Sequence, residues 1–483
     1  MHASQLPRSC DRCYCIKERC IRAPDSDSCD RCIRLNHECL RKRAPKRPGR
    51  RPKNEHSASA AQERDGSLQN PAVETLAAHE TSAMIDRVVA DLQLPSPEAT
   101  LLKQSILGEE FVEQFIIGPS FGDAHRKYLA EQLYGSPSKL GHAFTASAMS
   151  WGDDCDVASP APGSDKVHSG YFERMYNHAT KAVATLRSLK PSNAREMCLC
   201  IVLGTIILTF TLKLQVADAR AICRQTLEMV KPIYIRDDLF NKVSSEDLSL
   251  MSCLVLTDIA ESLMFCEPPT LRYRDIHSQD YVDRYVGISH SLLPLLHDVA
   301  ELSFQLKMEG GKVEGDSAAP TQFEQVHRAL EVKICSWMPE GRVGIGAGKF
   351  TSTELAHMLC QAEGLRNAAR LVLHRLRYTS GSQDNVAEAI SSHILTSLKT
   401  TALVTGSIPR CVDFPLIVAC LELESKSERA EYLSFLSPIS SYSSRFRERL
   451  SAIFDAAWEA RQDGQSLYWY DLGALIRELP ACP

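Results

Sequence analysis

Seven of the 35 residues between Ser9 and Arg43 are cysteine. Six of them follow one spacing, C-x2-C-x6-C, which occurs twice with eight residues between the copies: Cys10, Cys13, Cys20, Cys29, Cys32 and Cys39. Structural zinc is bound tetrahedrally by four ligands, and thiolates hold it at about 2.3 Å. Each copy supplies only three thiolates. Six can still satisfy two zinc ions if two of the thiolates each bridge both ions.

Two other uses of these cysteines fit the sequence less well. A secreted disulfide framework needs an export signal, and the first residues, MHASQLPRSCDRC, lack the apolar stretch of one. A thioredoxin-like C-x-x-C needs a surrounding βαβ pattern, which this segment does not have. The segment also has almost no aliphatic residues for a core, so metal binding would supply its folding energy. We therefore expect a cluster of two zinc ions per chain.

The cysteine spacing resembles that of the fungal zinc binuclear cluster (Zn2Cys6) family of transcription factors. The resemblance implies that Cys10 and Cys29 bridge both zinc ions, and that the other two cysteines of each copy complete one site. Cys15 lies outside the pattern and is expected to be an unliganded thiol.

The same resemblance assigns nearby basic residues to double-stranded DNA. In the family a short helix after the second cysteine enters the major groove, and Lys17 holds the place of its base-contacting lysine. The family's lysine contacts a C/G triplet, so the resemblance implies half-sites of the CGG type. An ammonium group donates well to guanine O6 and N7, which is the physical basis of a preference for G. Tyr14 and Ile16 stand where the family often has basic residues, so Lys17 lacks the basic neighbours that are usual in the family. Arginines matching phosphate-contacting positions, or further candidates for that role, are Arg19, Arg22, Arg12 and Arg34.

A basic stretch, RKRAPKRPGRRPK, directly follows Cys39 and Leu40. Clusters of this length suit a nuclear localisation signal. PGRRP resembles the core of an AT-hook, a minor-groove arm, but an extra arginine interrupts the usual Arg-Gly-Arg-Pro order. We expect a nuclear protein whose import depends on Arg41, Lys42, Arg43, Lys46, Arg47, Arg50 and Arg51.

Charge is divided unevenly along the 483 residues. The first 53 carry fifteen Lys and Arg against six acidic residues, a net charge of +9, whereas the remainder has 40 against 54, a net charge of −14. A basic N-terminal segment on an otherwise acidic chain suggests that only this segment binds a polyanion.

We expect a Zn2Cys6 DNA-binding domain over residues 8–41, a basic tail and flexible polar linker over 42–97, and a large all-α regulatory domain over 98–483.

The end of that linker carries one short amphipathic pattern, with Ile85, Val88, Val89 and Leu92 at helical spacing. A convincing coiled coil needs three or four heptads, so dimerisation by this route is not supported and the oligomeric state is left open.

From about residue 98 apolar residues recur at helical spacing, with few strand signals. The stripes in residues 171–186, which include Met175 and Tyr176, and in residues 443–458 are expected to face the core. Loops are expected at 135–168 and 309–320. Residues 197–212, MCLCIVLGTIILTFTL, carry no charge but are shorter than a membrane span, which favours a buried central helix over a membrane anchor. The eleven cysteines from Cys155 to Cys482 are interpreted as small buried apolar residues.

Blocks of this region resemble the fungal-specific transcription factor domain of the second type: GTIILTFTLKLQVADARAICRQTLEMV, LVLTDIAESLMFCEPPTLRY and FPLIVACLELESKSERAEYLSFL. The family's recurring residues are matched by Asp258, Pro268, Pro269, Phe414 and Pro415. The resemblance covers most of residues 98–480 and implies a helical regulatory domain, which in some relatives binds a small-molecule effector. Both a pocket and plain packing are compatible with the apolar helices.

The sequence matches no catalytic motif. GRVGIGAGKF (341–350) has the glycines of a flexible turn, but a phosphate loop needs Gly at Val343 and Ser or Thr at Phe350. HExxH, GxSxG and Rossmann fingerprints are absent. The absence of these motifs argues against an enzyme. The two resemblances imply a transcription factor of RNA polymerase II genes that contacts the transcription machinery. Regulators of this build often control one gene cluster, such as that for a specialised metabolite. The alternative is an effector-binding or scaffold protein with a structural zinc cluster.

Overall fold

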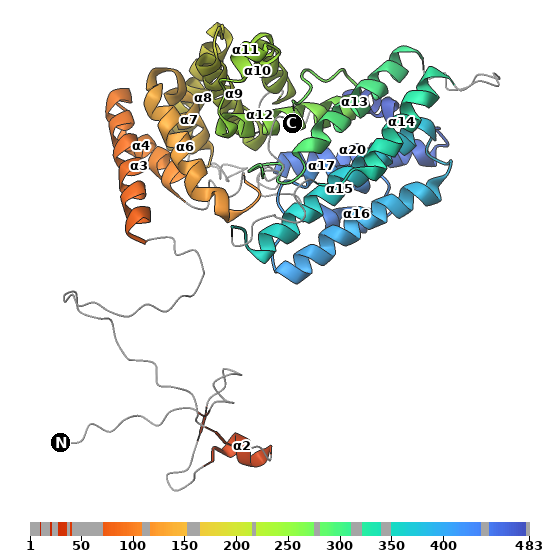
Figure 1. The fold of residues 1–483 in the computed structure, drawn as a ribbon, viewed down its shortest axis with the longest axis horizontal. Helices are drawn as coiled ribbons and strands as arrows, with labels where there is room; N and C mark the ends of the chain where they lie inside the picture. The colour runs from red at the N-terminus through yellow and green to blue at the C-terminus, as the bar shows by residue number, and fades with distance from the viewer. Residues whose placement is uncertain are drawn as a thin grey trace. The chain divides into compact units, whose positions relative to one another are not determined.

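The computed structural model describes residues 10, 20–21, 28–35, 39–40, 71–108, 116–151, 165–214, 219–274, 281–310, 321–339, 349–435 and 444–479. The chain forms two compact units, Met1–Asp65 and Gly66–Pro483. Within the described ranges the regular elements are helices, and the only β feature is an isolated bridge between Asp283 and Gly287. The larger unit is therefore all-helical, as the periodicity predicts (Figure 1).

One half of the larger unit is built from helices that pack as neighbours along the chain. Helix α9 packs on α10 and α7, and α7 also contacts α4, α6 and α8, so α7 and α9 lie at the centre of this half. The elements are α3 (Pro71–Leu92), α4 (Ser96–Leu107), η1 (Pro119–Phe121), α6 (Gly122–Gly135), α7 (Pro137–Ser150), α8 (Asp165–Ser188), α9 (Ala194–Leu214), α10 (Ala219–Tyr234), α11 (Asp237–Phe240) and α12 (Ser245–Phe265).

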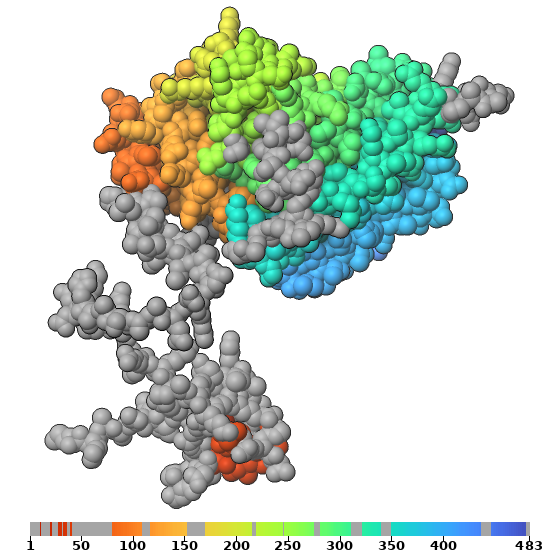
Figure 2. Space-filling view, viewed as in Figure 1, coloured from red at the N-terminus to blue at the C-terminus, as the bar shows by residue number. Residues whose placement is uncertain are grey.

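The other half is organised around the long helix α15, which contacts α13, α14, α16 and α17. Figure 2 shows the first half in orange to yellow-green and the second half in green to blue. The elements are η3 (His290–Leu292), α13 (Leu293–Met308), α14 (Gln322–Ser336), α15 (Ser352–Arg377), α16 (Asp384–Thr405), α17 (Asp413–Cys420), α18 (Lys426–Leu433), α20 (Ser444–Gln462), η4 (Trp469–Asp471) and α21 (Leu472–Glu478).

The predicted central helix is confirmed, since α9 is buried along nearly its whole length. Its close approach to α10 depends on Gly204, because a Cβ there would lie 2.2 Å from the hydroxyl oxygen of Thr226. Helix α9 and residues Glu246–Phe265 of α12 are long and apolar enough to cross a membrane, but 83% and 61% of their most apolar stretches are buried inside the fold. Core helices of a soluble domain pass the same test, so this finding is weak evidence for a membrane span.

The C-terminal elements return to close the end of α12. The indole Nε1 of Trp469 donates to the carbonyl of Leu263 at 2.9 Å, and Arg477 donates to the carbonyl of Phe265 at 2.9 Å. The last carbonyls of a helix have no partner within the helix. Two of those of α12 are thus satisfied by residues more than 200 positions further along the chain.

Three expectations about local structure need correction. Helix α7 occupies part of the predicted loop at 135–168, because Pro137 stands in its first turn, where a missing N–H costs nothing. Tyr176 is 39% exposed rather than on the buried stripe of α8, whereas Met175 is buried as predicted. Cys335 is exposed, although six of the other described cysteines beyond residue 98 are buried.

The packed domain also begins earlier than residue 98. Helix α3 (Pro71–Leu92) occupies the second half of the stretch assigned to the linker, and it packs on α4, α6 and α7. Ile85 and Val88 are fully buried in that contact, so the short amphipathic pattern belongs to the core of the domain. Of the expected loop at 309–320, residues 311–320 lie outside the described residues, between the end of α13 at Met308 and the start of α14 at Gln322.

Candidate metal centre

Four sulfur atoms meet in the N-terminal unit. The Sγ atoms of Cys10, Cys29, Cys32 and Cys39 all lie within 4.8 Å of one another. Cys10 Sγ is 3.8 Å from Cys29 Sγ and 3.8 Å from Cys32 Sγ. Four thiolates placed tetrahedrally at about 2.3 Å from a zinc ion stand about 3.8 Å from each other. The group therefore has the ligand type and number that one zinc ion requires, and two of its sulfur–sulfur distances match such a site.

The backbone brings the two copies of the cysteine motif into equivalent positions. The N–H of Cys10 donates to Cys20 Sγ at 3.4 Å, and the N–H of Cys29 donates to Cys39 Sγ at the same distance. Each bond joins the first and third cysteine of its copy, ten residues apart. Hydrogen bonds from backbone N–H groups stabilise negative charge on sulfur, as a metal-bound thiolate requires. The repeated spacing in the sequence thus corresponds to a repeated local geometry.

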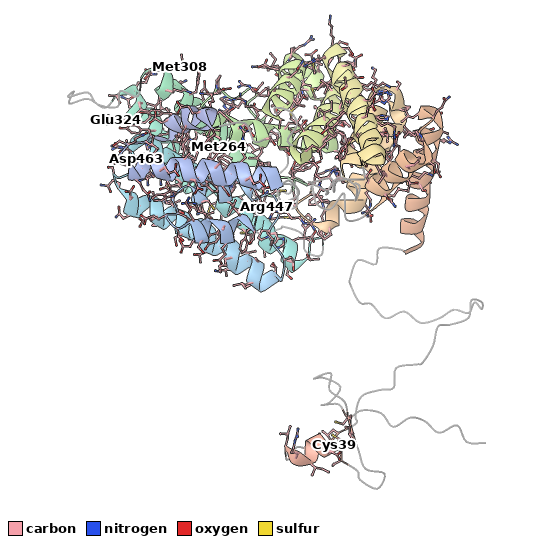
Figure 3. The ribbon with its side chains drawn as sticks, turned by 180° about the vertical axis from the view of Figure 1, so that it is seen from behind. Cys39, Met264, Met308, Glu324, Arg447 and Asp463 are labelled. Carbon is pink, nitrogen blue, oxygen red and sulfur yellow. The ribbon has the colours of Figure 1, made fainter. Side chains whose placement is uncertain are left out.

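A short helix, α2 (Asp30–Arg34), begins directly after Cys29 and carries Cys32. Its first turn is closed by the N–H of Ile33, which donates to the carbonyl of Cys29 at 3.0 Å. This turn places both sulfurs of the second C-x-x-C on the same side. Cys39 lies beside α2 in Figure 3.

The cysteines are also the apolar core of this unit. Cys10, Cys29 and Cys32 are fully buried, and Cys20 and Cys39 pack against them. Burial raises the pKa of Cys32 to about 12, and hydrogen bonds with the Cys29 and Cys10 thiols act in the same direction. Several thiolates this close together need a cation to stabilise them, and its binding would release their protons. The donor set therefore fits a structural zinc ion.

The predicted ligands divide into those that are described and those that are not. The four-sulfur group has the composition expected for one of the two zinc sites, with Cys10 and Cys29 as the bridging ligands. Cys20 touches the group through Cys10, while Cys13, like Cys15, lies outside the described residues. The presence of a second zinc ion stays a prediction.

Most of the predicted DNA contacts and the predicted import signal also lie outside the described residues: Arg12, Lys17, Arg19, Arg22, Arg41, Lys42, Arg43, Lys46, Arg47, Arg50 and Arg51. Arg34 is described, and it is exposed on α2 beside the exposed side chains of Ile33 and Leu35. This position is accessible to a phosphate. Residues 340–348 of the glycine-rich turn are likewise not described.

In the larger unit, the residues that match the second family hold segments together. Asp258 on α12 is fully buried, and its carboxylate accepts from the N–H of Thr270 at 2.6 Å and the hydroxyl of Thr270 at 2.9 Å. This bond fixes the Pro268–Pro269 segment after α12, and burial raises the pKa of Asp258. Pro415 at the start of α17 lies against Gly364 of α15, so closely that a Cβ on Gly364 would stand 3.2 Å from it. These contacts are architectural.

A buried polar network between α6 and the segment before α13 could not be predicted from the sequence. Asp283, fully buried, accepts from the hydroxyl of Ser252 at 2.9 Å, and the neighbouring Arg284 donates to His125 at 2.9 Å. The dipeptide Asp283–Arg284 has no sequence signal that separates it from ordinary surface charges. Only the fold shows that both side chains point inward.

A family model described as the fungal specific transcription factor domain matches residues 148–476. This range extends from the end of α7 into α21 and covers about two thirds of the chain. No curated protein and no solved structure matches the chain. The matched range contains Asp258 and Pro415, which lie at contacts between segments of the helical unit. The chain belongs to the family of transcription regulators that carry the fungal specific transcription factor domain.

Proposed function

We propose that this transcription regulator binds DNA sequence-specifically through an N-terminal zinc cluster and acts on RNA polymerase II genes in the nucleus. The observation that carries the proposal is the four-sulfur group, with two Sγ–Sγ distances of 3.8 Å, in a chain with a fungal specific transcription factor domain. A metal-organised basic head joined to such a domain would combine DNA recognition with regulation.

In this proposal zinc, when bound, crosslinks the cysteines and so folds a segment that has no aliphatic core. Six cysteines would hold two ions, with Cys10 and Cys29 as the shared ligands. Lys17 would donate to guanine O6 and N7, and the arginines around it would contact phosphates, which position the protein without reading sequence. The basic stretch over residues 41–51 would direct nuclear import and add to phosphate attraction.

The direct test uses the zinc-loaded full-length protein and fluorescence anisotropy. A duplex containing CGG half-sites is compared with a scrambled duplex of the same composition, at several salt concentrations. We expect tighter binding to the CGG duplex, and an advantage that persists at the highest salt, because base contacts depend less on counterion release than phosphate contacts do.

Equal affinity for both duplexes would reject sequence-specific binding. The result would favour the alternative in which the zinc cluster is structural and the chain is an effector-binding or scaffold protein. For target genes, chromatin occupancy mapping tests the proposal that the regulator controls one gene cluster. Occupancy concentrated at one cluster of neighbouring promoters is expected, and scattered occupancy with no such cluster would contradict it.

A further inference from the structure

The larger unit contains a partly open cavity of about 750 Å³ that the transcription-factor role does not by itself require. Pockets for drug-sized molecules measure about 300–1,000 Å³. Helices α9 and α12, which pack on each other, form one wall, and residues of α17 and α20 also line the cavity. Figure 3 labels Met264 of α12, which lines the cavity, and Arg447 in the first turn of α20.

Helices α9, α12 and α20 each line this cavity with one continuous face. On α12 the face comprises Cys253, Leu256, Thr257, Ala260, Glu261 and Met264, which recur at intervals of three and four. Helices α9 and α20 present shorter faces with the same spacing. In a packed core such faces interdigitate. Here all six residues of the α12 face stay only half-buried, so the space between the helices is shaped but not filled by the side chains that line it.

The polar groups in the α9–α12 wall are acceptors. The hydroxyls of Thr205, Thr209 and Thr257 each donate to the carbonyl four residues earlier in their own helix, at 2.8, 3.0 and 2.9 Å. A hydroxyl whose proton is used in this way still has oxygen lone pairs that accept hydrogen bonds. This wall is therefore suited to a ligand that donates, as a hydroxyl group does.

Tyr285 supplies a hydrogen-bond donor to the cavity. Arg284, always a donor, lies 2.9 Å from His125 Nδ1, which must therefore accept. Burial lowers the pKa of His125 well below its usual value, and the charge of Arg284 acts in the same direction. The neutral ring then carries its proton on Nε2 and donates it to the Tyr285 hydroxyl at 3.4 Å.

The hydroxyl proton of Tyr285 is consequently left without an acceptor among the described residues. Tyr285 is only 7% exposed, and both it and His125 line the cavity. A buried donor without a partner is costly, and a ligand acceptor would satisfy it. The ring is held in place through its backbone, because its N–H donates to Asp283 at 2.7 Å and its carbonyl accepts from Gln361 at 2.9 Å.

The turn that presents Tyr285 depends on a glycine. Gly287, bridged to Asp283, has a φ of +55°, and a Cβ there would stand 2.9 Å from Ile117. Only glycine adopts this conformation without strain in so crowded a place. The donor in the cavity is thus preorganised by a rigid turn.

We propose that this cavity binds a mainly apolar small molecule that carries a carbonyl oxygen for the Tyr285 hydroxyl and a hydroxyl group for the threonines of α9 and α12. Leucine, isoleucine, phenylalanine and methionine side chains contact its hydrocarbon body. This inference goes beyond DNA binding and does not rest on it. A chain that failed to bind DNA would still bind such a molecule.

The probe for this site is 6-propionyl-2-dimethylaminonaphthalene (prodan), an apolar ketone without a hydrogen-bond donor whose fluorescence responds to its surroundings. Titration into the full-length protein should show one saturable site per chain. Ala260→Phe fills the cavity from α12 and should abolish that site, whereas Ala389→Phe on the exposed side of α16 should not. Tyr285→Phe should weaken binding about 2- to 10-fold, the range expected for one neutral hydrogen bond, and the exposed Tyr134→Phe should leave it unchanged.

A competing ligand, 6-acetyl-2-naphthol, tests the acceptor wall, because it adds a hydroxyl to the ketone. Thr209→Val should weaken the binding of 6-acetyl-2-naphthol but not that of prodan. The isosteric Tyr285 and Thr209 variants keep the test valid even if Ala260→Phe fails to fold, which circular dichroism would show. Absence of saturable prodan binding, or equal affinity in Tyr285→Phe and the wild type, would overturn the proposal.

Discussion

The ion pair between Arg375 and Glu422 should be one of the most costly polar contacts to break in the helical domain. Arg375, in the last turn of α15, donates twice to the Glu422 carboxylate, at 3.0 and 2.6 Å, and both side chains are 4% exposed. Removing one partner of a buried pair typically costs about 3–5 kcal/mol, because the other charge is left uncompensated.

For Glu422→Gln we expect a loss in the free energy of unfolding near the lower end, about 3 kcal/mol. Asp384 still lies 2.8 Å from Arg375, and the carbonyl of Thr379 accepts from Arg375 at 2.9 Å, so part of the charge stays compensated. The assay is urea unfolding of the full-length protein, followed by circular dichroism at 222 nm.

The matched control is Glu431→Gln. Its partner Lys399 is also 2.8 Å away, but both side chains are about half exposed, and the expected loss is below about 1 kcal/mol. The double variant Arg375→Met, Glu422→Leu should recover at least half of the loss, because apolar replacement of a buried pair is often close to neutral. A loss for Glu422→Gln no larger than for Glu431→Gln would refute the reasoning.

Three further predictions concern DNA binding, import and pH. Lys17→Ala should cost about 1–3 kcal/mol of binding free energy on the CGG duplex and reduce the discrimination between the CGG and scrambled duplexes. Arg22→Ala should weaken binding to both duplexes alike and reduce the salt slope by about one unit. Anisotropy titrations check both variants, and a site preference retained by Lys17→Ala would contradict its role. Alanine at the seven basic residues within 41–51 should abolish nuclear accumulation of a fluorescent fusion, and accumulation that continued would place the signal elsewhere. Burial, with the charges of Arg272 and Lys231, lowers the pKa of His297 to about 4. The contribution of neutral His297 to the free energy of unfolding is therefore fully present above pH 6.5. It is lost by up to about 1.4 kcal/mol per pH unit as the pH falls from about 6.5 to about 4. Urea unfolding at several pH values should show a shallower fall for His297→Gln but not for the exposed His393→Gln, and an unchanged slope in His297→Gln would refute the assignment.

Patterns that depend on near neighbours could be predicted from the sequence. The uncharged stretch at 197–212 is the buried helix α9, and the stripe at 443–458 is the buried face of α20, with Leu450, Ile453 and Phe454 inside. The spacing of the cysteines likewise anticipated a group of sulfurs, whereas the meeting of Cys10 with Cys29 was implied by the resemblance to the Zn2Cys6 family. In these cases periodicity or spacing specifies the geometry directly.

Contacts between distant segments could not be predicted in this way. Arg284 reaches His125 across 159 positions, and Trp469 reaches the carbonyl of Leu263 across 206. Neither side chain has a neighbour in sequence that signals its partner. Helix α7 was missed for a different reason, because Ser136–Pro137 starts a helix as readily as it marks a loop.

The central claim is that zinc organises a sequence-specific DNA-binding head, and a zinc titration of the metal-free full-length protein tests it most directly. The signal is the anisotropy of the CGG duplex, with the scrambled duplex measured in parallel. We expect specific binding to rise with added zinc and to level off at two equivalents per chain. Cys29→Ser should show no such rise, because it removes a ligand shared by both ions. A plateau at one equivalent would contradict the two-zinc cluster, and specific binding without zinc, or equal binding to both duplexes at two equivalents, would contradict the central claim.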